Sequence, residues 1–471
     1  MKIAVIGAGY VGLVSAACFA ELGHEVITVD NDSEKVKLLI SGQVPIHENL
    51  LPELIHRHLG TRLHFSGDIK SAVEASDAVF ITVGTPPSSN GEADLSYVEG
   101  VARELASSLN GPKVVVEKST VPVRTCEALK HSMVLNGADP NSFMIASNPE
   151  FLREGTAVSD FLYPDRIVIG VDCGCSAEVL EEIYAPLTDG SYYKREDAIP
   201  GPWDAPARLI VTSVKSAELI KHASNAFLAM KISFINSVAN VCESVGADIR
   251  QVCEGVGADT RIGPKFLVPG IGYGGSCFPK DVLAFRSVAR AVGYDFDLLS
   301  AVMSVNEDQK ERFMEKVRKA LWTLRGKRLA VLGLAFKGGT DDVRDSPALG
   351  IVRRLAEEGA RVVAYDPAAM ERAKPLLSDL STVTFAKTVY EACDASDALL
   401  ILTEWQEFRK LNLKLVREML RLPLIIDGRN LLPAEEVEAA GLVYYSVGRQ
   451  ASPARPTGSD NTKAFAAATS S

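Results

Sequence analysis

Short apolar runs alternate along the first part of the chain with longer segments of helical periodicity. Residues 2–7 (KIAVIG) and 25–30 (EVITVD) are typical of buried strands, and a helical pattern that stops at Gly23 separates them. Two further strands are predicted at 77–84 (DAVFITVG) and 113–120 (KVVVEKST). Because buried strands alternate with helices, we predict an α/β fold with a doubly wound parallel sheet.

The same order of elements returns near the end of the chain. The four strands of the first part have counterparts in KRLAVLGLAFK (327–337), GARVVAYD (359–366), SDALLILT (396–403) and PLIIDGRN (423–430). We therefore predict two Rossmann-like domains, at residues 1–200 and 325–448. A protein built from two such domains usually works in the cleft between them.

A long helix is predicted between the two domains, over residues 212–246, because nothing interrupts its pattern before Gly246. A helix of about 34 residues spans about 50 Å. Its apolar positions nearly surround it, so more than one neighbour must bury them, and a second copy of the helix would do so. We predict that residues 201–324 form a central linker that joins the chain into a homodimer or a higher homo-oligomer. The Ala-, Ser- and Pro-rich tail at 449–471 is predicted to be disordered.

Composition and charge narrow the function. The 471-residue chain has a net charge of −10 and no long basic run, which argues against a nucleic-acid or membrane-surface partner. It contains no apolar run long enough to span a bilayer and opens directly on a strand, so we expect no membrane anchor and no signal peptide. Eight scattered cysteines are typical of reduced thiols in a cytoplasm. The CGC at 173–175 lacks a second cluster at zinc spacing, so we expect no metal.

The sequence GAGYVG at 7–12 fits the G-x-G-x-x-G pattern of dinucleotide-binding turns. Its context makes the pattern specific, because it follows a strand, opens a helix and is followed by an acid, Asp30, at the end of the next strand. Gly7 would form the turn, Gly9 would let the backbone approach a pyrophosphate, and Gly12 would let the helix pack closely. Asp30 would accept hydrogen bonds from a ribose and repel a 2′-phosphate, so the predicted cofactor is NAD.

The loop GYGGSCFPKD at 272–281 places a cysteine, Cys277, among glycines. A thiolate is a strong nucleophile toward carbonyls, and the nearby Lys280 would favour the thiolate form. A small buried cysteine is the other interpretation of such a residue. With NAD, a catalytic cysteine can oxidise an aldehyde to a carboxylate through a thioester.

Further candidate residues stand elsewhere in the chain. They are two carboxylates after a predicted strand, a lysine and an amide spaced i, i+4 on the long helix, and two basic residues in a loop of the second half: Glu150, Glu154, Lys221, Asn225, Lys337 and Arg344. The two basic residues are candidates for binding phosphate or a sugar nucleotide. A solvated charged loop is the alternative interpretation of their segment.

These motifs carry a resemblance. The segments GAGYVGL, VGTP, KSTVPV, NPEFLREG, AELIKHASNAFLAMKISFINSVA, GYGGSCFPKD and FKGGTDDVRDSPA occur in this order. Together they resemble the UDP-glucose/GDP-mannose dehydrogenase family over residues 1 to about 448, and within it the bacterial enzymes that act on UDP-glucose. The resemblance implies the four-electron oxidation of UDP-glucose to UDP-glucuronate, with two NAD consumed and no metal.

The resemblance also implies a catalytic set. Cys277 resembles the nucleophile that forms a thiohemiacetal and a thioester. Lys221 and Asn225 match residues that bind the sugar and stabilise the oxyanion. Asp281 matches a residue that positions a water together with Lys221, and Glu150 matches the acid that helps thioester hydrolysis.

Binding positions follow from the same resemblance. The NAD-contacting positions are Gly7, Gly9, Val11, Gly12, Asp30, Lys35, Thr85, Thr120, Glu154, Lys280 and Arg344. Thr120 also matches a residue that orders a water for catalysis. The UDP-sugar positions are Glu150, Phe151, Leu152, Arg153, Glu154, Lys221, Asn225, Arg261, Phe266, Leu267, Val268, Pro269, Gly270, Gly274 and Lys337. Among these, Arg261 resembles an arginine that the family lends to the substrate of the neighbouring subunit.

Three alternatives remain open at this point. The same chemistry could act on GDP-mannose or UDP-N-acetylmannosamine. A two-electron β-hydroxyacid dehydrogenase shares a Rossmann domain followed by a long helix, but it would need neither Cys277 nor the second α/β half. A protein that only senses dinucleotides would not need Cys277, Lys221 and Glu150 together.

Overall fold

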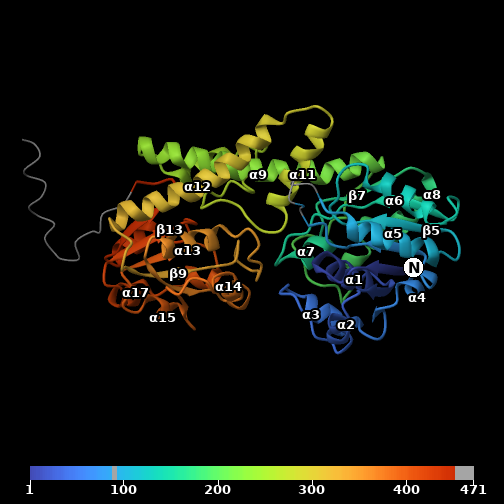
Figure 1. The fold of residues 1–471 in the computed structure, drawn as a ribbon, viewed down its shortest axis with the longest axis horizontal. Coiled ribbons are helices and arrows are strands. Elements are labelled where there is room, and N and C mark those ends of the chain that lie inside the picture. The colour runs from blue at the N-terminus through green and yellow to red at the C-terminus, as the bar shows by residue number, and fades with distance from the viewer. Residues whose placement is uncertain (87, 89–92, 451–471) are drawn as a thin grey trace, which may run out of the picture. The chain divides into compact units, whose positions relative to one another are not determined.

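The structure is a computed structural model, and it describes residues 1–86, 88 and 93–450. The chain forms two compact units (Figure 1): Met1–Phe227 with Cys277–Leu299, and Leu228–Ser276 with the chain from Ser300 onward. The predicted boundaries at 1–200, 201–324 and 325–448 remain a prediction. The tail predicted to be disordered, 449–471, lies outside the described residues from position 451.

The first unit contains an eight-stranded sheet with the order β3-β2-β1-β4-β5-β6-β7-β8. Its strands are β1 (Lys2–Ile6), β2 (Glu25–Val29), β3 (Leu63–Ser66), β4 (Ala78–Ile81), β5 (Lys113–Glu117), β6 (Phe143–Ser147), β7 (Ile167–Val171) and β8 (Leu209–Thr212). All neighbours pair in parallel except β6 and β7, which pair antiparallel with Ala146 opposite Val171. The apolar pattern did not predict this reversal, because a strand buried on both faces reads the same in either direction.

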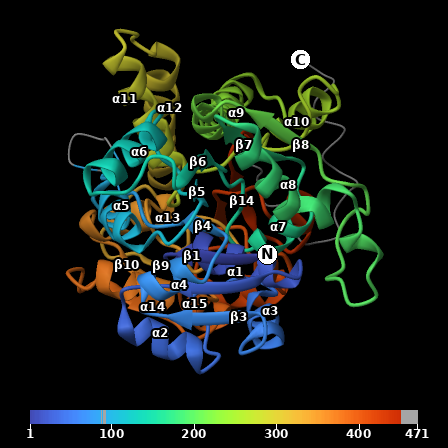
Figure 2. The same cartoon turned by 90° about the vertical axis from the view of Figure 1, so that its right-hand side faces the viewer.

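Helices cover both faces of this sheet. Along β1, Ile3 and Val5 point into one core, which the helices at 10–21, 51–58, 157–162 and 174–188 complete. Ala4 and Ile6 point into the other, with the helices at 69–74, 96–108 and 125–135. In Figure 2, α5 and α6 lie on one side of β4, β5 and β6, and α7 and α8 lie on the other. The helices of this unit that precede the long central helix are α1 (Tyr10–Glu21), α2 (Ser33–Ile40), α3 (Leu51–His58), α4 (Ile69–Glu74), α5 (Ser96–Ser108), α6 (Thr125–Leu135), α7 (Ala157–Leu162), α8 (Gly174–Thr188) and a 3₁₀ turn at Tyr192–Lys194.

The second unit contains a six-stranded, wholly parallel sheet with the order β11-β10-β9-β12-β13-β14. Its strands are β9 (Arg328–Leu332), β10 (Arg361–Tyr365), β11 (Val383–Phe385), β12 (Ala398–Ile401), β13 (Leu424–Asp427) and β14 (Val443–Ser446). Helices again bury both faces: α10 (Ile249–Gly257), α13 (Pro347–Glu357), α14 (Met370–Leu376), α15 (Val389–Cys393), α16 (Gln406–Arg409), α17 (Leu413–Met419) and α18 (Ala434–Ala439). The predicted fold class, two doubly wound domains with a long helix between them, is confirmed.

The long helix is α9 (Val214–Val245), which is close to the predicted 212–246 and contributes residues to both units. α11 (Phe278–Ala291) belongs to the first unit, and α12 (Asp297–Leu321) begins there and continues into the second. One side of α9 joins the core of the second unit through Ile235 and Ala239. Among the described residues, no helix combines the length and the apolarity needed to cross a bilayer.

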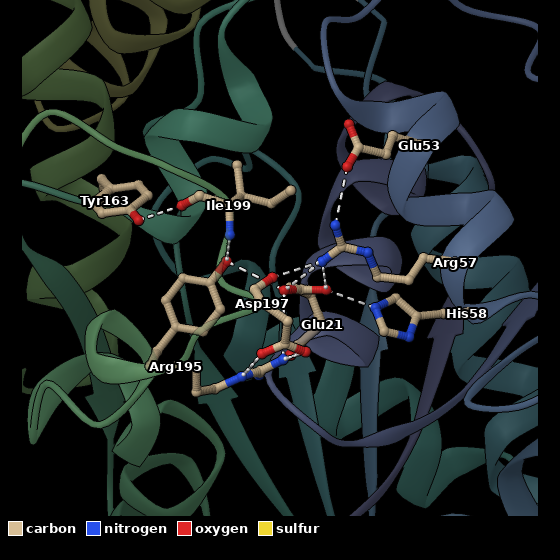
Figure 3. Close-up of polar contacts among 9 residues, drawn as sticks. Glu21, Glu53, Arg57, His58, Tyr163, Arg195, Asp197 and Ile199 are labelled. Atoms are coloured by element: carbon tan, nitrogen blue, oxygen red, sulfur yellow. Dashed lines mark hydrogen bonds and ion pairs between the residues drawn. The ribbon is translucent and has the colours of Figure 1, made fainter.

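A buried carboxylate ties the segment after α8 to the first unit (Figure 3). Glu21, the last residue of α1, is fully buried and accepts hydrogen bonds from Arg57 (3.2 Å) and His58 (2.7 Å) of α3. Arg195 lies 3.6 Å from the same carboxylate. Because a buried carboxylate needs such partners, this group holds the connection between α8 and β8 in one place.

Candidate active site

The glycine-rich turn after β1 shows two different needs for glycine. Gly7 has φ +105°, and a Cβ added there would lie 2.9 Å from the backbone oxygen of Thr82. A Cβ on Gly12 would lie 1.8 Å from the oxygen of Gly7, so the helix packs where no side chain fits. A Cβ on Gly9 would meet nothing within 4 Å. The fold itself therefore requires the first and third glycines, and the second leaves space for whatever approaches the start of α1.

Asp30 lies directly after β2 and faces this turn. Its carboxylate accepts hydrogen bonds from the backbone N–H of Ala8 (2.8 Å) and from Lys35 Nζ (3.0 Å) on one oxygen, and from the N–H of Asp32 (2.9 Å) on the other. Burial raises the pKa of Asp30, but these donors outweigh that effect and hold the pKa below its usual value. An ionised acid therefore lies beside the turn, where an NAD ribose would need an acceptor.

A buried ion pair forms the centre of the candidate site. Lys221 of α9 donates to Glu150 Oε1 at 2.7 Å, and both side chains are 5% exposed. Burial alone would raise the pKa of Glu150, but the charge of Lys221 and a hydrogen bond from Leu152 N–H (2.6 Å) lower it below its usual value. Burial alone would lower the pKa of Lys221, but Glu150, Cys277 and Asp281 raise it above its usual value. Lys221 is therefore a cation at neutral pH, suited to stabilising negative charge.

A second pair lies one turn further along α9. Asn225 donates to Asp281 Oδ2 at 2.5 Å, and both side chains are buried. The other oxygen, Oδ1, lies 3.6 Å from Lys280 Nζ and accepts no hydrogen bond from the described residues. Asp281 belongs to α11, which begins directly after Cys277. The start of a helix favours a negative charge, which suits a thiolate at that position.

Two threonines connect the candidate residues Lys280 and Glu150 to each other. Thr85 donates to the backbone oxygen of Thr120 (2.8 Å) and accepts from Lys280 Nζ (3.1 Å). The hydroxyl of Thr120 lies 3.5 Å from Glu150 Oε1. Segments that are far apart in the sequence, after β4, β5 and β6 and at the start of α11, therefore meet at one place in the first unit.

Sequence reasoning missed a buried lysine behind this site. Lys118, two residues before Thr120, donates to Asn148 Oδ1 (2.9 Å) and lies 3.4 Å from the hydroxyl of Tyr184. Complete burial lowers its pKa to about 8, partly offset by the charge of Glu150. The signal was present in the sequence, because Lys118 and Asn148 directly follow the buried strands β5 and β6, but only the fold pairs them.

The segment after Glu150 packs around the same site. The ring of Phe151 has the Arg166 guanidinium 3.6 Å from its centroid and Lys221 Nζ at 5.5 Å. Leu152 is half-buried, and the exposed side chain of Arg153 pairs with Asp160 at 2.6 Å.

The turn that follows Glu154 is held against the start of α1. The carboxylate of Glu48 accepts from the N–H groups of Gly155 (2.7 Å) and Ala157 (2.8 Å) and from the hydroxyl of Tyr10. Sequence reasoning missed Glu48 and Tyr10, although Tyr10 stands inside the glycine motif. Val11 follows it and is half-buried.

The second unit holds the remaining predicted positions. Gly270 is fixed by Asn236 of α9, which accepts its N–H at 2.8 Å, and by Gln309 of α12, which donates to its oxygen at 2.9 Å. In the segment Phe266–Gly270, Leu267 is buried, Val268 is 63% exposed and Phe266 has φ +68°. This segment thus presents an apolar side chain and its backbone from a fixed position.

The glycines that precede Cys277 are required by packing. A Cβ on Gly274 would lie 2.1 Å from the oxygen of Asp345, and one on Gly275 would lie 2.7 Å from the ring of Phe336. Gly275 also donates its N–H to the oxygen of Arg344 at 3.0 Å. The loop is therefore glycine-rich because it runs against the segment 336–347 of its own unit.

The predicted basic residues of this unit differ in their surroundings. Arg261 pairs with its neighbour Asp259, and its side chain is 87% exposed. Arg344 pairs with Asp342 at 2.7 Å, and Lys337 Nζ lies 5.5 Å from the ring centroid of Phe336. A residue that sequence reasoning missed, Arg429, donates to the backbone oxygens of Leu402, Gly272 and Phe336.

Fold and site together define the class of this protein. One unit contains a glycine turn with an ionised acid, a buried lysine, two further acids and a cysteine at a helix start, and this set is typical of a dinucleotide-dependent oxidoreductase. The residues fit NAD, because Gly9 leaves room at the turn and Asp30 is ionised and oriented beside it.

The family follows from comparison with known proteins. The NAD binding domain, the central domain and the UDP binding domain of the UDP-glucose/GDP-mannose dehydrogenase family match residues 1–188, 215–308 and 330–434. The chain belongs to this family. It is 47% identical over 451 residues, 96% of this chain and 94% of the relative, to the UDP-glucose 6-dehydrogenase TuaD of Bacillus subtilis. It is also 47% identical to the UDP-glucose 6-dehydrogenase of Rhizobium meliloti, over 95% of this chain and all of that protein.

Among solved structures, a UDP-glucose dehydrogenase from the archaeon Pyrobaculum islandicum is similar, with a TM-score of 0.84 and 38% identity. The similarity covers 95% of this chain and 97% of that one. The family membership and the NAD binding domain predicted from the motifs are thus confirmed.

Proposed function

We propose that this protein is an NAD-dependent UDP-glucose 6-dehydrogenase that oxidises UDP-glucose to UDP-glucuronate. The observation that carries the proposal is the buried Lys221–Glu150 pair beside Asn225 and Asp281, in a unit that also contains Cys277. The relatives with this name match nearly the whole chain, which supports the choice of substrate.

Lys221 and Asn225 would act on the oxygen at the reacting carbon. When bound, NAD would accept a hydride at each of two oxidations, from the alcohol and then from the thiohemiacetal. The protonated ammonium of Lys221 would stabilise the negative charge that develops on this oxygen. A positioned donor of this kind increases the rate by about 10²–10³. Asn225 is held by Asp281, so its amide has a defined orientation.

Cys277 would retain the aldehyde between the two oxidations. Its sulfur adds to the aldehyde carbon and forms a thiohemiacetal, which becomes a thioester when the second hydride leaves. Water then cleaves the thioester, so that the carbon leaves as a carboxylate and the thiol is restored. In total the sugar carbon loses four electrons as two hydrides.

The two acids of the site, Glu150 and Asp281, would activate the water. Glu150 is ionised and faces Thr120, which places a carboxylate and a hydroxyl where a water can be held. Asp281 Oδ1 accepts no hydrogen bond from the described part of the chain and can accept one from a water during proton transfer.

The second unit would bind the nucleotide part of the substrate. The segment Phe266–Gly270 offers backbone groups and the exposed Val268, and Gly274 allows the chain to run closely past Asp345. Lys337 and Arg344 are the cations suited to a pyrophosphate. Of these, the resemblance assigns Arg344 to NAD and Lys337 to the UDP-sugar.

We also propose that the protein assembles as a homodimer through α9. The side chains of Phe227, Phe234, Val241 and Val245 on this helix are 57%, 57%, 60% and 70% exposed. The first three are seven residues apart, which places them along one seam of a helix. A second copy of α9 would cover this seam, and in that assembly Arg261 is the residue we expect to reach the partner's substrate.

The size of the protein in solution tests this assembly. Phe234→Glu places a charge in the seam, and we expect light scattering coupled to gel filtration to show a shift from dimer to monomer. Leu135→Glu is the matched control, because Leu135 is 73% exposed at the end of α6 and is not part of α9. A monomeric unmodified protein, or a dimer that survives Phe234→Glu, would contradict the assembly.

We place the enzyme in the cytoplasm, because NAD and nucleotide sugars are used there and because Cys277 acts as a reduced thiol.

The decisive experiment counts the NADH formed per sugar consumed, with UDP-glucose, GDP-mannose and UDP-N-acetylmannosamine in parallel. We expect two NADH per UDP-glucose and little turnover of the others. One NADH per sugar would remove the role of Cys277. Two NADH with another sugar would keep the mechanism and change the substrate.

A further inference from the structure

Two cysteines outside the candidate active site lie in contact at the surface of the first unit. Cys173 follows β7 and caps α8, and Cys175 lies in the first turn of that helix. Their sulfur atoms are 2.6 Å apart, and Cys175 Sγ lies 3.2 Å from Met144 Sδ. Cys175 is exposed and Cys173 is half-buried, so reagents in solution can reach the pair.

The fold holds these sulfur atoms together. Cys173 has an extended backbone (φ −140°, ψ 157°), and the chain turns into α8 at Gly174, which directs both side chains to the same side. Because Ala146 lies opposite Val171 in the antiparallel β6–β7 pair, Met144 comes opposite Cys173. The contact thus arises at a junction of two strands and a helix, all within a single unit.

The two thiols are chemically different. The hydrogen bond from the Cys175 thiol, followed by that from Ser176 (3.4 Å), lowers the pKa of Cys173. The same pairing raises the pKa of Cys175. The position at a helix start also favours a negative charge on Cys173. Cys173 is therefore the sulfur that we expect to attack first.

We propose that Cys173 and Cys175 form a redox-active dithiol that is oxidised to an intramolecular disulfide by low-molecular-weight disulfides of the glutathione class. The Cys173 thiolate attacks one sulfur of the oxidant, whose other half leaves as a thiolate and takes a proton. Cys175 then loses its proton and attacks the Cys173 sulfur, which expels the second half of the oxidant. Two thiols lose two electrons and two protons, and one disulfide of the oxidant becomes two thiols.

The geometry favours the second step over a lasting adduct. Cys175 Sγ is already in contact with the sulfur that it must attack, so the step is intramolecular and needs no large movement. A disulfide that is exposed and closes over a single intervening residue belongs to the labile class, so thiols such as dithiothreitol should reverse it. This site is separate from the chemistry proposed for Cys277.

The test uses the full-length protein, oxidised glutathione at neutral pH and peptide mapping by mass spectrometry. We expect the peptide with residues 173–175 to lose the mass of two hydrogens and to regain it with dithiothreitol. In Cys175→Ser the reaction should stop at a glutathione adduct on Cys173, and Cys173→Ser should form no disulfide. Cys253→Ser is the control, because Cys253 is half-buried and burial raises its pKa to about 11. It should react as the unmodified protein does.

Three results would overturn the proposal. The first is a lasting glutathione adduct at 173 or 175 in the unmodified protein, because it would show that the second thiol does not attack. The second is a pair that stays reduced while glutathione modifies another cysteine. The third is a Cys175→Ser protein in which Cys173 forms no glutathione adduct, because it would show that Cys173 does not attack the oxidant. Because the peptides are separate, a reaction at Cys277 is recognised and does not obscure these outcomes.

Discussion

The Lys221–Glu150 pair allows a structural role to be separated from a catalytic one. Lys221→Met removes the ammonium and leaves Glu150 buried without its main partner. Breaking a buried ion pair in this way costs about 3–5 kcal/mol. For a unit of this size the melting temperature would fall by roughly 6–20 °C, at about 2–4 °C per kcal/mol. If Lys221 also stabilises an oxyanion, the rate of NADH formation should fall by about 10²–10³ in the same variant.

A second substitution distinguishes the two effects. In the double variant Lys221→Met/Glu150→Gln the buried carboxylate is replaced by a neutral amide, so no buried charge is left without its partner. We therefore expect most of the lost stability to return. The rate should stay low, because neither substituted side chain supplies the cation. Thermal unfolding monitored by circular dichroism and initial rates of NADH formation give the two readouts.

The dependence of stability on pH provides a further check. In the unmodified protein the pKa of Glu150 is lowered, so its contribution is present above the usual carboxyl pKa and is lost as the pH falls through the lowered value. In Lys221→Met burial dominates and the pKa of Glu150 should rise. The contribution of Glu150 to stability should then be fully present below the usual carboxyl pKa and should be lost as the pH rises through the raised pKa. An unchanged melting temperature in Lys221→Met, or a double variant that regains activity, would refute this account of the pair.

Three more predictions follow from other parts of the chain. Cys277→Ser should bind NAD and the sugar nucleotide but yield no carboxylate, and normal UDP-glucuronate output would exclude the covalent mechanism. Asp30→Ala should weaken NAD binding at least tenfold and reduce the preference over NADP, and unchanged constants in a cofactor titration would show that Asp30 does not read the ribose. Glu21→Ala should lower the free energy of unfolding, measured in urea, by about 3 kcal/mol. The control is Glu53→Ala, because Glu53 is an exposed partner of the same Arg57, and it should lower the free energy of unfolding by under about 1 kcal/mol. Equal losses would contradict the role of the buried network.

The order of strands and helices could be predicted because local pattern decides it. Strands that are buried on both faces, such as β4 (Ala78–Ile81), are apolar throughout, and the helix 212–246 keeps its periodicity without a break. The glycine turn is local as well, since Gly7, Gly9 and Gly12 act within a few residues of one another. These features need no knowledge of distant parts of the chain, and the predicted fold class was confirmed.

Contacts between distant segments could not be read in the same way. Lys221 and Glu150 stand 71 positions apart, and Asn225 and Asp281 stand 56 apart, so their spacing in the sequence carries no information about distance. The resemblance to a family supplied these four residues and their roles as expectations, but not their pairing, their hydrogen bonds or their burial. Lys118 was missed because its pKa of about 8 results from complete burial next to Asn148. The local sequence pattern does not indicate that burial.

The sequence by itself thus determined the elements, the dinucleotide turn and the chemical types of the candidate residues. Tertiary structure decided which of them meet, the reversal of β7 that brings Met144 beside Cys175, and the reason for the glycines near Cys277, which is close packing against 336–347. The physical reason is the same in each case. Backbone conformation and periodicity depend on neighbours in the chain, whereas burial, ion pairing and pKa depend on neighbours in space.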